Sequence, residues 1–254
     1  MRIALYQMDC RWEDAAFNRA EAERWIASRR ADLFVLPEMF TTGFTMSPDR
    51  AAEPCEGETA SWLCRMARKT GSAVAGSVAV RCGGSDFRNR FFFALPDGSL
   101  RFYDKRHLFR MGGEGAHYRP GDERVVVEYR GWRILLQVCY DLRFPVWSRN
   151  RNDYDLILYA ANWPASRARA WRTLLAARAI ENQCYVAGVN RVGEDALASY
   201  SGDSVVFDFK GEPLAAAEPC RVQSVAAELD REALLAFREK FPAFLDADRF
   251  EFVR

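Results

Sequence analysis

The sequence predicts an α/β fold with mixed sheets. Short runs rich in β-branched and aromatic residues alternate with longer amphipathic segments, a pattern typical of strands interleaved with helices. The turn sequences at 96–99 (Pro-Asp-Gly-Ser) and 209–212 (Phe-Lys-Gly-Glu) indicate hairpins, so antiparallel pairs should mix with crossover pairs. No internal repeat or Pro/Gly/Ser-rich linker interrupts the pattern. We therefore expect a single domain covering residues 1–254.

The predicted strands are short apolar runs with turn residues at their ends. They cover residues 2–7, 33–36, 73–80, 90–95, 100–103, 125–129, 133–138, 156–160, 185–190, 204–207 and 222–227. The predicted helices carry apolar residues at helical spacing. They cover residues 13–30, 58–70, 146–152, 167–182 and 231–240.

The segment 241–254 is expected to pack against protein rather than extend into solvent. It interleaves charged residues with Phe241, Phe244, Leu245, Phe250, Phe252 and Val253. So much apolar surface is unfavourable in water. We expect this tail to pack on a neighbouring subunit or across its own domain.

The charges nearly cancel, with 36 Lys and Arg residues against 35 Asp and Glu. No single-sign block of the kind that binds nucleic acid or a membrane surface occurs. The apolar stretch 3–6 is too short for a signal-peptide core, and no later run approaches the length of a membrane span. We therefore expect a cytoplasmic protein with no nucleic-acid or membrane partner.

The seven cysteines are odd in number, scattered and without a C-x-x-C pair, so they indicate reduced thiols rather than a disulfide framework. His107 and His117 are the only histidines, and neither has zinc-site spacing to two cysteines. No nucleotide-binding glycine motif occurs. The sequence therefore predicts neither a metal nor a cofactor.

Four predicted strands lead into a polar residue able to do chemistry. These residues are Glu38, Lys105, Cys139 and Asn162. Ligands bind outside the carboxyl ends of strands in α/β sheets, so one shared cleft is the simplest interpretation. Cys139 also lies between a strand and a predicted helix start at Pro145, where free N–H groups and a nearby lysine should favour the thiolate.

Each of these residues also has a purely structural explanation. A cysteine after an apolar strand is usually a small core hydrophobe. Glu38 after Leu-Pro suits a loop or a helix cap, and Lys105 suits a solvated surface charge. Their combination favours function, because a nucleophile, a base and a fixed cation suffice for amide hydrolysis without a metal.

Three segments resemble the signature motifs of the nitrilase superfamily. They are Leu-Pro-Glu-Met-Phe (36–40), Tyr-Asp-Lys-Arg-His-Leu-Phe (103–109) and Val-Cys-Tyr-Asp-Leu-Arg-Phe-Pro (138–145). The likeness continues through 177–183 and 202–204, and 38–44, 105–109 and 162–164 look most like bacterial omega-amidases. The resemblance implies a four-layer α-β-β-α sandwich that commonly forms a homodimer. It also implies hydrolysis of the terminal amide of a small 2-oxo acid such as 2-oxoglutaramate.

The resemblance assigns roles to the three strand-end residues. Glu38, with a pKa raised by partial burial, would take the Cys139 proton, and the thiolate would attack the amide carbon. Lys105 and the backbone N–H of Tyr140 would stabilise the oxyanion. A further family position falls on Glu114, which either orients Lys105 or the substrate, or is an exposed acid in a flexible Gly-rich loop.

A substrate carboxylate would be held best by a bidentate guanidinium, for which Arg143 and Arg110 are the candidates. Asn162 is expected at the substrate site. A small pocket could have walls formed by aromatic residues, although core packing is their commoner fate. These residues are Phe44, Tyr140, Trp163 and Trp171.

Three alternatives remain open at this point. The substrate could be a nitrile, an N-carbamoyl compound or a plain aliphatic amide. His107 could instead be the base for Cys139 in a protease-like pair, although a structural role for this histidine is favoured because Glu38 already supplies a base. The chain could also be a binding or redox-sensing protein that keeps the fold without catalysis.

Overall fold

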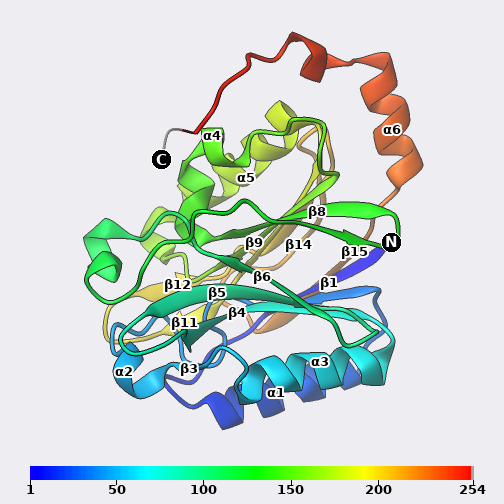
Figure 1. Ribbon diagram of the computed structural model, residues 1–254. Helices are drawn as coiled ribbons and strands as arrows, with labels where there is room; N and C mark the ends of the chain where they lie inside the picture. The colour runs from blue at the N-terminus through cyan, green and yellow to red at the C-terminus, as the bar shows by residue number, and fades with distance from the viewer. Residues whose placement is uncertain (253–254) are drawn as a thin grey trace.

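Two sheets form the centre of the fold in a computed structural model that describes residues 1–252 (Figure 1). The first sheet has the order β15-β1-β2-β4-β5-β6, with β3 paired to β4. Its strands are β1 (Arg2–Gln7), β2 (Leu33–Val35), β3 (Glu53–Pro54), β4 (Ala73–Arg81), β5 (Phe87–Ala94), β6 (Leu100–Asp104) and β15 (Gln223–Glu228).

The second sheet has the order β14-β13-β10-β9-β8-β7. Its strands are β7 (Val126–Tyr129), β8 (Trp132–Val138), β9 (Leu156–Ala161), β10 (Tyr185–Asn190), β13 (Val205–Phe207) and β14 (Pro213–Ala216). A separate hairpin joins β11 (Val192–Glu194) to β12 (Ser199–Ser201). Parallel and antiparallel pairs occur in both large sheets, which confirms the mixed topology.

The alternation of side chains along β1 shows how the layers are held. Ile3 and Leu5 enter the core between the two sheets, where they join residues of β8, β9 and β10. Ala4 and Tyr6 point to the opposite face, into a second core beneath the helices. Successive residues of a strand face opposite sides, so a strand apolar on both faces must be covered on both.

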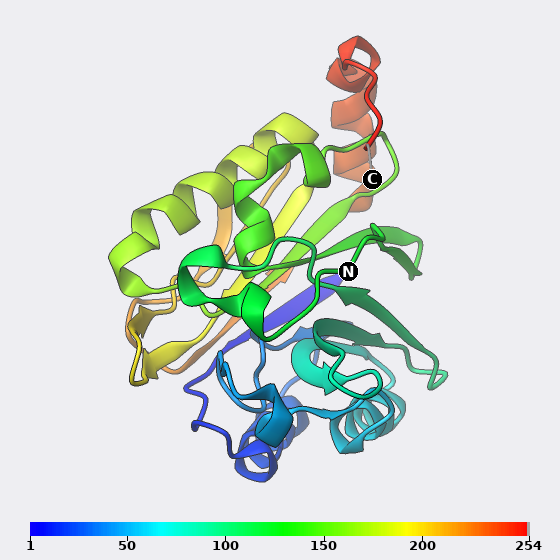
Figure 2. The same cartoon turned by 60° about the vertical axis from the view of Figure 1, so that its left-hand side comes forward.

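Helices cover both outer faces, giving a four-layer α-β-β-α arrangement (Figures 1 and 2). Helices α1 (Ala15–Ala27) and α3 (Glu58–Thr70) pack on the first sheet, and α5 (Ala168–Asn182) packs on the second. A Cβ on Gly188 of β10 would lie 2.5 Å from Leu175 of α5, so this close approach requires glycine. The fold implied by the family resemblance is confirmed.

Both predicted hairpin turns are confirmed, since 96–99 joins β5 to β6 and 209–212 joins β13 to β14. The helix predicted at 146–152 is wrong beyond its first turn, because α4 spans only Pro145–Ser148. The side chain of Asn150 donates to the carbonyls of Tyr154 and Asn182, and Asn152 has a φ of 59°. These hydrogen bonds, one of them to a residue 32 positions away, hold the segment in a non-helical conformation. The remaining short elements are α2 (Pro48–Ala51) and the 3₁₀ turns at 110–112, 114–116, 139–143, 165–167 and 243–246.

Helix α6 (Arg231–Lys240) and the segment after it form an arm that follows β15 of the first sheet and returns to α4 (Figure 1). The Phe252 ring lies 4.9 Å from that of Trp147, and the Arg151 guanidinium lies 4.6 Å from the Phe250 ring. The arm therefore packs against its own domain through Phe250 and Phe252. Val253 and Arg254 of the predicted tail lie outside the described residues. Among residues 1–252, no helix combines the length and apolar character needed to cross a membrane.

Candidate active site

The sheet register brings the strand-end residues of the second sheet to one edge. Strands β8, β9 and β10 are parallel, with Val138 opposite Ala160 and Ala160 opposite Val189. Cys139 follows β8 directly, and Asn162 follows β9. Glu38 follows β2 of the first sheet, and its carboxylate meets the backbone N–H of Asn162 at 2.8 Å. The site therefore lies where the two sheets meet.

A buried ion cluster occupies this meeting point. The Nζ of Lys105 lies 2.9 Å from Oε1 of Glu38 and 3.0 and 2.9 Å from the two carboxylate oxygens of Glu114. All three side chains are inaccessible to solvent. Burial would lower the pKa of Lys105, but the charges of Glu114 and Glu38 outweigh it and hold the pKa above its usual range. The ammonium is therefore protonated at neutral pH.

Asparagines orient the Glu38 carboxylate. Asn89 on β5 donates to Glu38 Oε1 at 2.7 Å, and its own side-chain oxygen accepts from the Ser77 hydroxyl on β4. The Nδ2 of Asn162 donates to the backbone carbonyl of Glu38 at 2.7 Å. Side chains fixed by such secondary contacts hold a reactive group in one geometry.

Cys139 lies at a tight bend between β8 and a 3₁₀ turn. Its φ is 45°, a left-handed conformation that non-glycine residues rarely adopt. Buried Asp141 stabilises the bend by accepting from the N–H of Val138 at 3.0 Å and from the Tyr103 hydroxyl at 2.8 Å. Since Tyr103 lies two residues before Lys105, Asp141 joins the thiol bend to the segment that carries the cation.

The thiol is neutral in the resting protein, which corrects the expectation of a favoured thiolate. Burial raises the pKa of Cys139 well above its ordinary value, and the negative charge of Glu38 raises it further. Lys105 lowers it, but by less. The expected helix contributes little because α4 has only four residues. A proton acceptor is therefore needed before the sulfur can attack.

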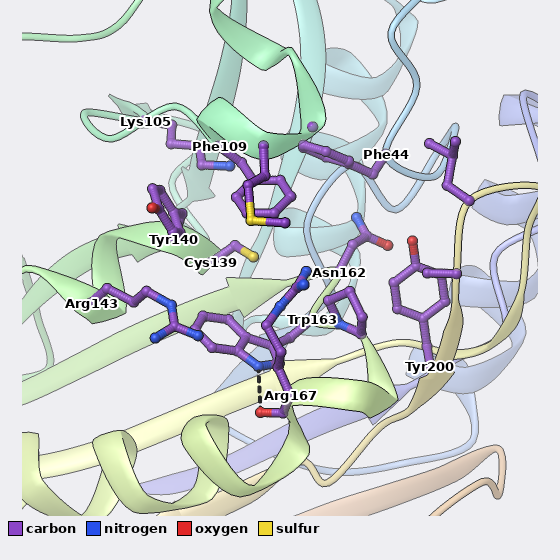
Figure 3. A pocket seen from close by; sticks show the side chains of 15 residues that line it. Phe44, Lys105, Phe109, Cys139, Tyr140, Arg143, Asn162, Trp163, Arg167 and Tyr200 are labelled. Atoms are coloured by element: carbon purple, nitrogen blue, oxygen red, sulfur yellow. Dashed lines mark hydrogen bonds between the residues drawn. The ribbon is translucent and has the colours of Figure 1, made fainter.

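The sulfur opens into a cavity of about 360 Å³ (Figure 3). The predicted residues that line it are Phe44, Lys105, Cys139, Tyr140, Arg143, Asn162 and Trp163. Glu38 and Glu114 lie next to Lys105 but do not line the cavity, and two further predicted residues lie elsewhere. Arg110 lines a separate surface depression, and Trp171 is fully buried behind Trp163, with ring centroids 5.5 Å apart.

The structure also shows the contacts of Glu114 and His107, two residues whose roles the sequence left open. Glu114 is fully buried and accepts from the N–H of Phe109, so it is not the exposed acid of a flexible loop. The Nδ1 of His107 lies 2.8 Å from Asp141 Oδ1, and its ring stacks on Phe144 at 3.9 Å. His107 therefore supports the bend that carries Cys139.

Sequence reasoning missed four residues that shape the site. Ser77 interrupts an apolar strand, and a polar residue in such a run was an available signal. Asn89 lies between Arg88 and Arg90, so no such signal marked it. Arg167, at the start of α5, and Tyr200, on the β11–β12 hairpin, line the cavity. Nothing in a single sequence separates Arg167 from the many surface arginines.

Residues 2–239 match the family model described as carbon-nitrogen hydrolase. The chain belongs to the carbon-nitrogen hydrolase family. It is 54% identical, over 98% of both chains, to a protein named omega-amidase YafV from Yersinia enterocolitica. It is also 36% identical, over 96% of both chains, to a 2-oxoglutaramate amidase from Bacillus subtilis.

A crystal structure of a CN-hydrolase superfamily protein from Xanthomonas campestris, with an arsenic adduct in its active site, shares this fold. Its TM-score is 0.96 at 46% identity, and the match covers 100% of this chain and 99% of that one. This carbon-nitrogen hydrolase is therefore an enzyme that cleaves amides, as the motifs at 36–40, 103–109 and 138–145 indicated.

Proposed function

We propose that this carbon-nitrogen hydrolase is an omega-amidase that releases ammonia from the terminal amide of a small 2-oxo acid through a thioester on Cys139. The observation that carries the proposal is the buried cluster of Glu38, Lys105 and Glu114 beside a thiol that opens into a small cavity. Relatives named omega-amidase and 2-oxoglutaramate amidase support the same activity.

In the first half of the reaction, the Glu38 carboxylate takes the proton from Cys139 and the sulfur attacks the amide carbon. An ammonium has three N–H donors, and two of those on Lys105 face Glu38 and Glu114. The third, with the backbone N–H of Tyr140, stabilises the oxyanion. Glu38 then returns its proton to the leaving nitrogen, the C–N bond breaks, and ammonia departs.

In the second half, Glu38 takes a proton from water, and the resulting hydroxide attacks the thioester carbon. The C–S bond breaks, the carboxylic acid product forms, and the Cys139 sulfur recovers the proton from Glu38. Glu114 keeps Lys105 in place through both halves by its contacts at 3.0 and 2.9 Å. One carboxylate thus serves as base and acid in turn.

The cavity suits a short, anionic substrate. Its volume of about 360 Å³ is at the lower end of the range for ligand pockets. Phe44, Tyr140 and Trp163 form apolar walls, and Asn162 lies at the inner end beside Glu38. Within residues 1–252, the cavity lining contains arginine side chains and no carboxylate. A carboxylated amide fits this charge pattern better than a neutral nitrile or aliphatic amide does.

A substrate panel tests this proposal against its rivals. Ammonia release is measured with 2-oxoglutaramate, 2-oxosuccinamate, an aliphatic amide, an N-carbamoyl amino acid and a nitrile, with Cys139→Ala as control. We expect kcat/KM to be highest for the 2-oxo acid amides and undetectable for the variant. A preference for any other class would reject the omega-amidase assignment, and no turnover at all would favour a binding protein.

We also propose a single-domain, cytoplasmic homodimer. All seven cysteines are free thiols, which suits a reducing compartment. Several large apolar side chains lie exposed on α4, α5 and the arm, and burying them would stabilise a dimer. They include Val146, Ile180, Leu235, Phe241 and Leu245. Sedimentation analysis should give a dimer mass, and Phe241→Glu with Leu245→Glu should shift it toward the monomer.

A further inference from the structure

The cations around the cavity differ in whether a carboxylate is already paired with them. Lys105 contacts both Glu38 and Glu114, so two carboxylates already surround its one positive charge. Arg143 and Arg167 have no carboxylate within ion-pair distance among residues 1–252. An anionic substrate that approaches the two glutamates needs a cation of its own, and the arginines are available.

Arg167 is rigidly mounted at the cavity. It ends the 3₁₀ turn 165–167 and is the N-cap residue of helix α5, and its N–H donates to the Pro164 carbonyl at 3.0 Å. Its own carbonyl accepts from the indole N–H of Trp163 at 2.9 Å, the contact drawn in Figure 3. Because both ends of its peptide unit are fixed, little backbone ordering is required when the side chain binds a ligand.

The guanidinium of Arg167 projects into the cavity. It lies 5.2 Å from the centre of the Phe109 ring, and Figure 3 shows it on the Cys139 side of the pocket. The ring supports a planar cation without using any of its N–H donors, so the donor fork stays free for a carboxylate. Phe109 is itself held by the bond from its N–H to the buried Glu114.

Arg143 is placed differently. Its residue is exposed, and its guanidinium lies 5.0 Å from the Trp163 ring. Figure 3 shows this side chain beside the Trp163 indole. Arg167 is half-buried, and an exposed cation is screened by water and contributes less to binding than a half-buried one.

We propose that Arg167 binds the substrate carboxylate and thereby determines the specificity of this enzyme for anionic amides. The inference rests on the proposed omega-amidase function and names the residue that recognises the acid end of the substrate. Two parallel N–H···O bonds from Arg167 fix the far end of the molecule while Lys105 and the Tyr140 N–H hold the amide oxygen. The 2-oxo acid amide is thus held at both ends across Cys139.

The test compares an anionic and a neutral amide of similar length in the same variants. The kcat/KM for 2-oxoglutaramate and for pentanamide is measured in wild type, Arg167→Gln and Arg167→Lys. We expect Arg167→Gln to lower the value for 2-oxoglutaramate by about 10- to 100-fold, mainly through KM, and that for pentanamide by less than about 3-fold. Arg167→Lys should recover part of the loss because it restores the charge but not the fork.

Two further variants control for general effects of losing an arginine. Arg169→Gln removes an exposed charge from the first turn of the same helix, outside the cavity lining, and should leave both substrates unaffected. Arg143→Gln should have a smaller effect than Arg167→Gln. An unchanged ratio of the two substrates in Arg167→Gln, or a larger loss in Arg143→Gln, would overturn the assignment. A wild-type enzyme that prefers pentanamide would instead overturn the proposed function.

Discussion

Lys105 and Glu114 form an ion pair that is completely enclosed by protein, with the ammonium 3.0 and 2.9 Å from the two carboxylate oxygens. The two residues lie nine positions apart, on opposite sides of the 3₁₀ turn at 110–112. The pair orients the cation toward the cavity without exposing either charge. Without Glu114, Lys105 would keep its contact with Glu38 but lose the second carboxylate that fixes its position.

Glu114→Gln should lower kcat by about 100-fold because the amide no longer holds Lys105 by charge. KM should change little, since Glu114 does not line the cavity. Steady-state ammonia release measures both constants. A variant with wild-type kcat would assign Glu114 a purely structural role.

Glu38→Gln should abolish turnover, with a loss of about 10³-fold or more, because the neutral thiol of Cys139 then lacks its proton acceptor. The amide keeps the shape of the carboxylate, so the fold should persist. Ammonia release and thermal unfolding are compared with wild type. Retained activity in Glu38→Gln would show that Glu38 is not the base. The His107→Asn variant serves as a comparison and should keep most activity, because Glu38 and not His107 accepts the proton.

Asn89→Ala should reduce kcat by about 10- to 100-fold through misplacement of Glu38, to which Asn89 donates at 2.7 Å. KM should stay close to the wild-type value because Asn89 does not reach the cavity. Steady-state measurement of kcat and KM separates an effect on the position of Glu38 from an effect on substrate binding. A rise in KM of about 10- to 100-fold with unchanged kcat would show that Asn89 affects substrate binding instead.

The stability of the protein should fall above about pH 8.5. Burial raises the pKa of Cys10 to about 12, so the folded chain keeps this proton at a pH where the unfolded chain has lost it. The unfolding free energy therefore decreases as pH rises from the unfolded pKa toward the folded one. Between pH 8 and pH 10, Cys10 alone should contribute a loss of about 2 kcal/mol.

Urea unfolding of wild type and Cys10→Ala at the two pH values measures this contribution. The variant should lose less stability between pH 8 and pH 10 than wild type does. Parallel losses in both proteins would show that Cys10 does not cause the dependence. Buried Cys139 and Cys184, whose pKa values are also raised, should leave a residual slope in the variant.

The strand-end residues were predictable because regular strands fix where a chain emerges from a sheet. Glu38, Cys139 and Asn162 each follow a strand whose apolar pattern was clear, and all three meet at one edge of the fold. The four layers followed from the family resemblance. Strand β1 shows why four layers are needed: Ile3 and Leu5 are buried on one face, and Ala4 and Tyr6 are buried on the other.

The remaining features depend on long-range packing that local patterns do not encode. The neutral Cys139 thiol results from burial and from Glu38, which is about 100 residues distant in the chain. The helix predicted at 146–152 fails because Asn150 bonds to Asn182, a partner on another helix. The position of Arg167 depends on Trp163 and Phe109.

The central claim is that Cys139 carries the acyl group of the substrate during turnover. Intact-protein and peptide mass spectrometry after rapid acid quenching with 2-oxoglutaramate tests it directly. We predict one adduct, equal in mass to the substrate minus ammonia and located on Cys139, that is absent from Cys139→Ala. Ammonia release at full rate with no adduct in wild type, or with Cys139 replaced by Ala, would contradict it.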